Sequence, residues 1–172
     1  MDLAPTSSTT AALAMGDALA MVLLQRKGFR PEDFARFHPG GALGRKLTTT
    51  VADLMVSRDY PEVRERVQIR DCIVPLARMR GTVPIVDAGR RVVGVVTAGD
   101  LTRLMERRED FLDVSVDEVM TRNPRTAVPG ALAGTVVRDM EQFGIMALPV
   151  VDEGGELLGV VHLHDILKAG LA

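Results

Sequence analysis

The sequence predicts an α+β fold in which one module occurs twice, with pseudo-twofold symmetry between the copies. Met55 and Asp100 recur 65 residues later as Met120 and Asp165, and the strings between them keep the same register. Each half also holds two β-branched runs joined by turn residues, which is typical of a hairpin. Such a repeat indicates two copies of one supersecondary unit, each burying its apolar face against the other.

The first element expected is a helix in the leading segment, where residues 11–24 are almost wholly apolar. Short hydroxyl side chains precede it, so we expect Thr9 or Thr10 as the N-cap. Arg26 and Gly28 have the chemistry of a helix end. A helix that is apolar nearly all round has to be buried. It packs on the repeats, mediates self-association, or has lost its native surroundings.

The same apolar run does not fit a targeting signal, because the first charge is Asp2 and Asp17 interrupts the run. At 14 residues it falls short of the roughly 20 that span a bilayer. The single cysteine, Cys72, fits a reducing compartment and is expected to be buried and inert. We therefore expect a soluble, cytoplasmic protein without membrane association.

Charge and aromatic content exclude a nucleic-acid partner. The chain has 21 basic and 23 acidic residues, no Trp, one Tyr and five Phe. Nucleic-acid binding needs a basic footprint and usually stacking aromatics, and neither is present.

A short helix is expected around residues 31–34, and the glycine-rich string FHPGGALGRK follows at residues 37–46. It lacks the Gly-Lys-Ser/Thr of a phosphate loop and the spacing of a dinucleotide fingerprint. The pattern favours a tight turn with a solvent-facing basic pair. The alternative is that His38 serves as an acid/base group.

Each copy predicts a helix, a two-stranded hairpin and a second helix. The first helices are expected over residues 70–80 and 131–143. The expected core-facing residues are Ile73, Leu76, Ala77, Val136, Val137 and Met140. The strands are expected over 83–86 with 92–96, and over 148–151 with 157–161.

The strings APTSSTTAALAMGDALAMVLL and FHPGGALGRKL resemble the end of the sugar-isomerase (SIS) domain of arabinose-5-phosphate isomerases. In that family two cystathionine-β-synthase-type (CBS) motifs follow the SIS domain. The resemblance covers essentially the whole chain. It implies a helical remnant of the SIS α/β domain at 1–50, CBS motif 1 at 51–110 and CBS motif 2 at 111–172.

The resemblance also implies a reaction, the interconversion of D-arabinose 5-phosphate and D-ribulose 5-phosphate for the octulosonate sugar of lipopolysaccharide. The family's H-P-G-G histidine, implicated in its active site, aligns with His38. The family's phosphate loop, lysine and two glutamates lie upstream of the P-T-S-S-T segment. We therefore expect a C-terminal piece that is not catalytically complete alone. The alternative is that it supplies His38 to a separately encoded SIS half.

A CBS pair implies two clefts, in which a ligand lies with its base against apolar strand residues. A Ser/Thr-x-x-Asp string addresses its phosphate and ribose, and residues 97–100 match it with Thr97 and Asp100. A hydroxyl and N–H groups at a helix start suit phosphate, and a carboxylate accepts from ribose hydroxyls. The alternative is that Thr97 or Asp100 only caps the helix from Leu101.

In the second copy His162 replaces the threonine, and Asp165 can still contact a ribose. His162, when protonated, can meet a phosphate. Strand periodicity places His162 and His164 on one face, but two imidazoles and one carboxylate are a weak metal signal, so no metal is expected. The clefts are unequal, and we expect one to be occupied.

We therefore predict the regulatory CBS pair of an arabinose-5-phosphate isomerase, binding an adenosyl or cytidyl nucleotide or a sugar phosphate as a small-molecule ligand. No catalytic cofactor is expected. The alternative is a pair with empty clefts that acts as a dimerisation module. A homo-oligomer is expected in either case, with the helix over 11–24 as the candidate interface.

Overall fold

Residues 5–37 and 41–171 are described in a computed structural model of this chain. The chain divides into two units, Met1–Thr48 and Thr49–Ala172. The α+β fold with a repeated module is confirmed by the element order of the second unit.

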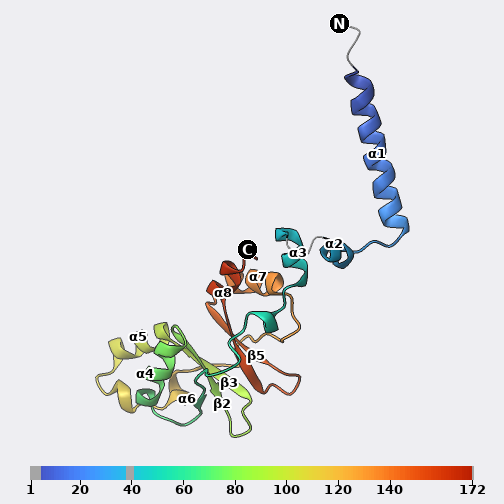
Figure 1. The fold of residues 1–172 in the computed structure, drawn as a ribbon. Coiled ribbons are helices and arrows are strands. Elements are labelled where there is room, and N and C mark those ends of the chain that lie inside the picture. The colour runs from blue at the N-terminus through green and yellow to red at the C-terminus, as the bar shows by residue number, and fades with distance from the viewer. Residues whose placement is uncertain (1–4, 38–40, 172) are drawn as a thin grey trace. The chain divides into compact units, whose positions relative to one another are not determined.

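The first unit begins with helix α1, Ser7–Arg26 (Figure 1). Its N-cap is Thr6, so the expected cap at Thr9 or Thr10 is wrong. The Thr9 and Thr10 hydroxyls lie inside the helix and donate to the Thr6 carbonyl at 2.9 and 3.0 Å. The predicted end is confirmed, since Gly28 follows with φ of +62°, a conformation that glycine adopts without steric cost.

Helix α1 is 20 residues long, and none of its residues is buried. By length and composition it is long and apolar enough to cross a membrane, which corrects the expectation based on a 14-residue run. The helix is longer because the hydroxyl residues before the apolar run are helical too. A core helix of a soluble protein meets the same criteria, so the helix does not by itself indicate a membrane protein.

Two short helices complete the first unit, α2 over Pro31–Phe37 and α3 over Ala42–Thr48. Helix α2 confirms the predicted short helix. Helix α3 limits the predicted turn to the residues before Ala42, since the basic pair at 45–46 is helical, and both of its residues are exposed as expected. Residues 38–40 of the predicted turn, His38 among them, lie outside the described residues.

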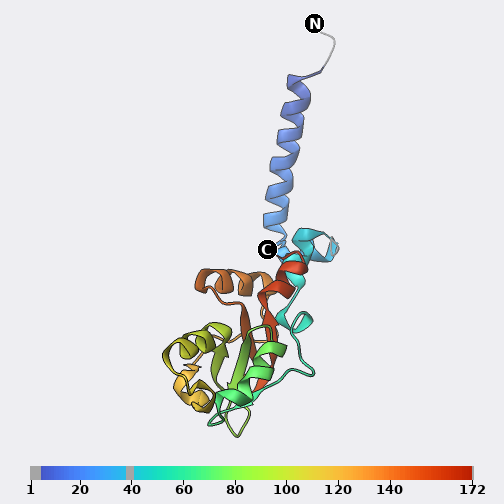
Figure 2. The ribbon, with the colours of Figure 1, turned by 90° about the vertical axis from the view of Figure 1, so that its left-hand side faces the viewer.

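The two copies of the module make up the second unit (Figures 1 and 2). The elements of the first copy are η1 (Val51–Asp53), β1 (Val63–Arg64), α4 (Ile69–Arg78), β2 (Thr82–Val86), β3 (Val92–Thr97) and α5 (Ala98–Arg107). Those of the second are η2 (Phe111–Asp113), α6 (Val116–Val119), β4 (Thr121–Arg122), α7 (Ala133–Phe143), β5 (Ala147–Val151), β6 (Leu157–His162) and α8 (Leu163–Lys168).

Both predicted hairpins form, and they are antiparallel with the same register. Strands β2 and β3 pair Pro84 with Val95, and β5 and β6 pair Pro149 with Val160. The tips of the hairpins meet, because the Val92 N–H donates to the Gly155 carbonyl and the Leu157 N–H to the Arg90 carbonyl, both at 3.0 Å.

The segment that leads into each copy pairs with the hairpin of the other copy. Val56 forms a bridge with Val160, and Thr121 of β4 pairs with Val95. Both crossings depend on a glycine, because a Cβ on Gly94 would lie 2.5 Å from the Met120 sulfur and one on Gly159 would lie 2.5 Å from the Val56 carbonyl oxygen. These exchanged segments tie the copies into one unit.

The copies are not identical in length at their first helix. Helix α4 has 10 residues and α7 has 11. The offset of 65 residues holds at the strands, but α7 begins 64 residues after α4, at Ala133 against Ile69. Helix α7 therefore begins one residue earlier within its copy than α4 does, whereas both helices end at equivalent positions.

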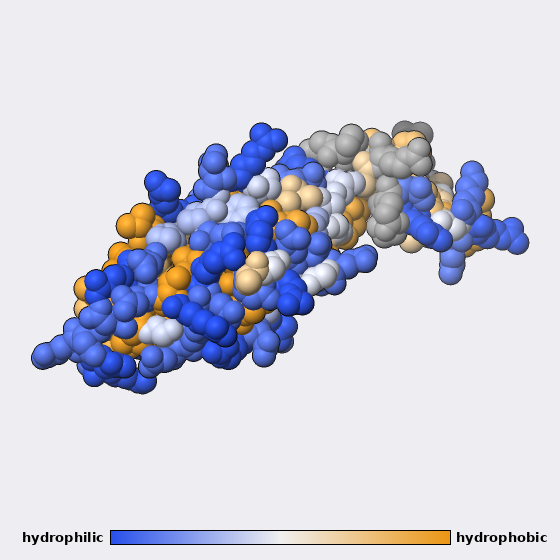
Figure 3. All heavy atoms as spheres, turned by 90° about the horizontal axis from the view of Figure 1, so that it is seen from below, coloured by the Kyte–Doolittle hydropathy of each residue, from blue (hydrophilic) through white to orange (hydrophobic). Residues whose placement is uncertain are grey.

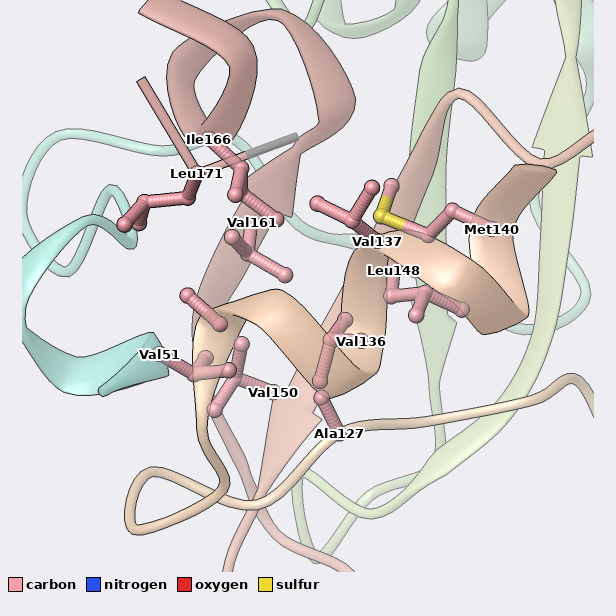
Figure 4. Close-up of a cluster of buried hydrophobic side chains, with 11 residues drawn as sticks. Val51, Ala127, Val136, Val137, Met140, Leu148, Val150, Val161, Ile166 and Leu171 are labelled. Atoms are coloured by element: carbon pink, nitrogen blue, oxygen red, sulfur yellow. The ribbon is translucent and has the colours of Figure 1, made fainter. Parts of the chain in front are cut away.

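Each copy has its own core. The core of the second copy gathers Val136, Val137 and Met140 of α7 with strand residues and Val51 (Figure 4), which confirms the core face predicted for that helix. In α4 two of the three predicted core residues are wrong: Leu76 is buried, but Ile73 and Ala77 are exposed.

The buried face of α4 instead carries Ile69 and Cys72 beside Leu76. Burial raises the pKa of the Cys72 thiol to about 11, with a smaller contribution from Asp71. This residue is thus the unreactive core thiol that the sequence predicts. On the face drawn in Figure 3, hydrophilic residues cover most of the surface and hydrophobic ones show between them in patches.

Candidate functional site

A cleft of about 650 Å³ opens between the two copies of the module. Its walls are residues 80–82 and 97–99 of the first copy, residues 123–125 of the connection after β4, and residues 144–149 of the second copy, with Val95 and Thr121 between them. Both copies therefore contribute to one site, and strands β3 and β5 hold its apolar side.

The described lining of the cleft is positively charged. Arg80 and Arg125 line it, and no acidic residue is among its described lining residues. The guanidinium carbon of Arg125 lies 3.5 Å from the centroid of the Phe143 ring, a cation–π contact that restrains the side chain. Since the whole chain has a net charge of −2, the positive lining is a local feature and suits an anion.

Two residues of the lining have backbone angles that side chains rarely adopt. Arg80 has φ of +51° and Asn123 has φ of +47°. Such conformations cost free energy and are concentrated at functional sites, although asparagine tolerates them better than arginine. Arg80 lies two residues after the end of α4 and Asn123 directly after β4, and both line the cleft.

Thr97 lies in the cleft wall and also caps helix α5. Its hydroxyl accepts from the Asp100 N–H at 3.2 Å, and its own N–H and hydroxyl donate to Asp100 Oδ2 at 2.8 and 2.7 Å. This is a complete capping box. The capping interpretation of the Thr-x-x-Asp string is thus present in the structure, and a ligand contact would be made in addition to it.

Asp100 does not line the cleft. It pairs with Arg103 and lines a separate depression of about 160 Å³ with Arg107 and Glu118. Its two oxygens are therefore occupied within its own helix end.

The second copy places its residues differently. His162 is the last residue of β6 and is buried, whereas His164 lies in helix α8 and is exposed. The expectation that both imidazoles share one strand face is wrong, because the strand ends between them. Among the residues that the structure describes, no group of three His, Cys, Asp or Glu side chains is placed to hold a metal ion.

Burial lowers the pKa of His162, the positive charge of Arg80 lowers it further, and Asp165 opposes this. The neutral imidazole is thus favoured near neutral pH, whereas the expected phosphate contact requires the protonated form.

Asp165 reaches across to the first copy. Arg80 Nη1 donates to both of its carboxylate oxygens, at 2.9 and 3.0 Å. Asp165 occupies the repeat position of Asp100, but it has no capping partner, because His162 makes no side-chain bond at the start of α8.

The space that corresponds to the cleft on the other side of the repeat is filled by side chains. Met79 stands at the repeat position of Gly144, and Tyr60 stands at that of Arg125. Both pack with Ala147 and Val160, and the Tyr60 hydroxyl donates to the Leu157 carbonyl at 3.2 Å. A residue-by-residue alignment of the two copies would have shown these exchanges in the sequence. Comparing only the residues that recur, such as Met55 and Met120, does not reveal them.

The repeated module matches a known protein family. The CBS domain family matches residues 51–107 and 116–172, which is more than half of the chain. This chain belongs to the CBS domain family. The resemblance of the repeat pair to CBS motifs is thereby confirmed.

Solved CBS structures have the same fold. The CBS domain pair of protein MJ0100, in complex with 5′-methylthioadenosine and S-adenosyl-L-methionine, matches with a TM-score of 0.61 and 26% identity, over 70% of this chain and 94% of that one. CBSX2 in complex with AMP matches with a TM-score of 0.62 and 25% identity, over 71% of this chain and 96% of that one.

The CBS pair and the leading segment also match a longer curated protein. The chain is 44% identical to arabinose 5-phosphate isomerase KdsD of Salmonella typhi over 99% of its own length. It spans about half of that relative, 52%. The similarity to arabinose-5-phosphate isomerases read from the sequence is therefore confirmed.

Proposed function

We propose that this CBS pair binds an anionic nucleotide in its open cleft and regulates an arabinose-5-phosphate isomerase. The observation that carries the proposal is the lining of the cleft, in which Arg80 and Arg125 face an apolar wall from β3 and β5 without any acidic residue among the described ones. A nucleotide has the matching parts, an apolar base and an anionic phosphate.

In this proposal the base lies against Val95, Ile145 and Leu148. The phosphate lies near the start of α5, where Thr97 and the helix N-terminus favour negative charge. Asp100 contacts the ribose, which requires its carboxylate to leave Arg103 and to turn from its separate depression toward the cleft. His162 and Asp165 would contact a ligand only on the filled side of the repeat, so the open cleft binds its nucleotide without them.

The ligand class is adenosyl or cytidyl. The adenosyl compounds bound by the CBS pair of MJ0100 and the AMP bound by CBSX2 support the first. A volume of about 650 Å³ accommodates either nucleoside monophosphate.

The catalytic part of the proposal rests on the KdsD relatives. The reaction is the interconversion of D-arabinose 5-phosphate and D-ribulose 5-phosphate in a cytoplasmic homo-oligomer. His38 is its candidate acid/base residue, and this chain alone is not catalytically complete. The CBS pair would change activity by binding one arrangement of the enzyme more tightly than another.

Thermal unfolding of the purified chain with AMP, ATP, CMP and arabinose 5-phosphate tests the ligand. A nucleotide at about 100 times its Kd stabilises the fold by roughly 2.7 kcal/mol, which raises Tm by several degrees. Arg125→Ala should weaken binding about tenfold, since it removes a charged contact. The control Arg138→Ala, on the exposed side of α7, should bind as the wild type does.

A second candidate is a dimerisation module whose clefts stay empty. It is favoured by the apolar residues exposed on helix α4, where Ile73 is 37% and Val74 62% exposed. No thermal shift with any nucleotide, together with a dimer mass by light scattering, would support this function over ligand binding.

A further inference from the structure

Arg80 lines the open cleft and also forms an ion pair with Asp165. Its guanidinium holds the Asp165 carboxylate through two bonds of 2.9 and 3.0 Å. Arg80 follows α4 of the first copy, and Asp165 lies in the first turn of α8 of the second. The ion pair therefore connects the wall of the cleft with the helix that follows the last strand.

The pair is accessible enough to be exchanged. The Arg80 side chain is 52% exposed and that of Asp165 is 25% exposed. Exposed ion pairs are weak, and the bonds described here use one nitrogen of a group that has five N–H donors. A phosphate in the cleft offers more acceptor oxygens than a carboxylate and suits a guanidinium at least as well.

The repeat shows that this contact is not imposed by the fold. Asp100, at the equivalent position, is bound by Thr97 and Arg103 of its own helix end. Asp165 lacks such a cap and spans the two copies instead. The second copy thus presents to Arg80 the kind of group that an anionic ligand would present.

We propose that Asp165 is an internal competitor for Arg80, which an anionic group of the ligand displaces when the cleft fills. The pair then lowers the affinity of the empty cleft, and its opening removes the ion pair that connects α8 to the residues after α4. This inference rests on the proposed function, because it names the anion-binding residue of the same cleft and how its occupancy is transmitted.

Calorimetric titration of the full chain with AMP, and separately with inorganic pyrophosphate, tests the competition. Asp165→Asn keeps the shape and removes the charge, so it should bind both probes about two- to fivefold tighter than the wild type, the range set by an exposed pair. Arg80→Ala should bind more weakly. Asp165→Asn should have no effect when Arg80 is already alanine, because the competition is then absent.

Asp139→Asn is the matched control. Asp139 lines a depression beside Arg125, so this substitution also removes one negative charge near the cleft. Equal tightening by both variants, or tightening by Asp165→Asn that persists without Arg80, would reduce the effect to general charge and overturn the proposal. Asp165→Ser serves as a second uncharged variant should the asparagine protein not fold.

The two probes separate the proposals. If AMP binds the wild type and Asp165→Asn equally, the competition is refuted while the nucleotide function stands. If AMP binds neither the wild type nor Asp165→Asn, the nucleotide function fails, and the titration with pyrophosphate then tests the competition. Tighter pyrophosphate binding by the variant upholds the competition, and equal or absent binding overturns it.

Discussion

The two copies of the CBS module have the same strand pairing, but only one of the two equivalent clefts is open. Their hairpins pair in the same register, and each copy's lead-in segment crosses to the other hairpin at an equivalent bridge. Yet the space beside Gly144 and Arg125 is open, whereas the space beside Met79 and Tyr60 is filled. Met79 and Tyr60 thus occupy on one side of the repeat the space that stays open beside Gly144 and Arg125 on the other.

The largest expected effect concerns the crossings that both copies need. Gly159→Ala brings a Cβ to 2.5 Å from the Val56 carbonyl oxygen, which cannot move without disturbing the bridge between Val56 and Val160. Gly94→Ala meets the Met120 side chain, which can change rotamer. We expect a loss of unfolding free energy of about 3 kcal/mol for the first and about 1 kcal/mol for the second. Urea denaturation measures both, and equal losses would show that the two crossings are energetically alike.

The second test turns the open cleft into its filled counterpart. Gly144→Met places at this position the side chain that the other copy has there, and nothing lies within 4 Å of a Cβ at Gly144. We expect nucleotide affinity to fall at least tenfold because the side chain occupies the cleft.

Gly144→Ala is its control. It carries the same backbone cost, since φ is +64°, without the bulk. It should lose stability but keep affinity within about twofold, a change of roughly 0.4 kcal/mol. Equal loss of affinity in both variants would assign the effect to the backbone.

The smallest effect concerns His162, which has no titrating counterpart in the first copy, where Thr97 stands. Its pKa lies below the ordinary value of 6.5, first because of burial and then because of Arg80. The unfolded chain therefore binds the proton more readily. Unfolding free energy should decline as pH falls below about 6.5, until the lowered pKa of the folded chain is passed.

His162→Gln should flatten this part of the curve when urea denaturation is compared between pH 5 and 7.5. Unchanged curvature in the variant would show that another group causes the pH dependence.

Local patterns predicted most of the frame. The hairpins, the short helix α2 and the buried face of α7 follow from β-branched runs, turn residues and helical spacing, all of which act within a few residues. The face of α4 was misjudged because its periodicity admits more than one stripe. Contact with β2 and η2 selects the stripe of Ile69, Cys72 and Leu76.

Of the predicted ligand residues, Thr97 lines the cleft, and its role there stays a prediction. Arg80, Asn123 and Arg125 were not predicted from the sequence, because each lies in a connection between elements and belongs to no recognised motif. Their charges and backbone angles indicate a binding site only once the fold has brought these connecting segments together around the cleft.

Two features could be predicted without the structure: the chain repeats a module, and its string at residues 97–100 starts a helix after a strand. These are properties of neighbours along the chain. Three other features are visible only in the folded chain: the lead-in segments exchange between hairpins, Met79 and Tyr60 fill one cleft, and Arg80 pairs with Asp165. The physical reason is that these contacts join residues far apart in sequence, whose proximity depends on how the two copies pack.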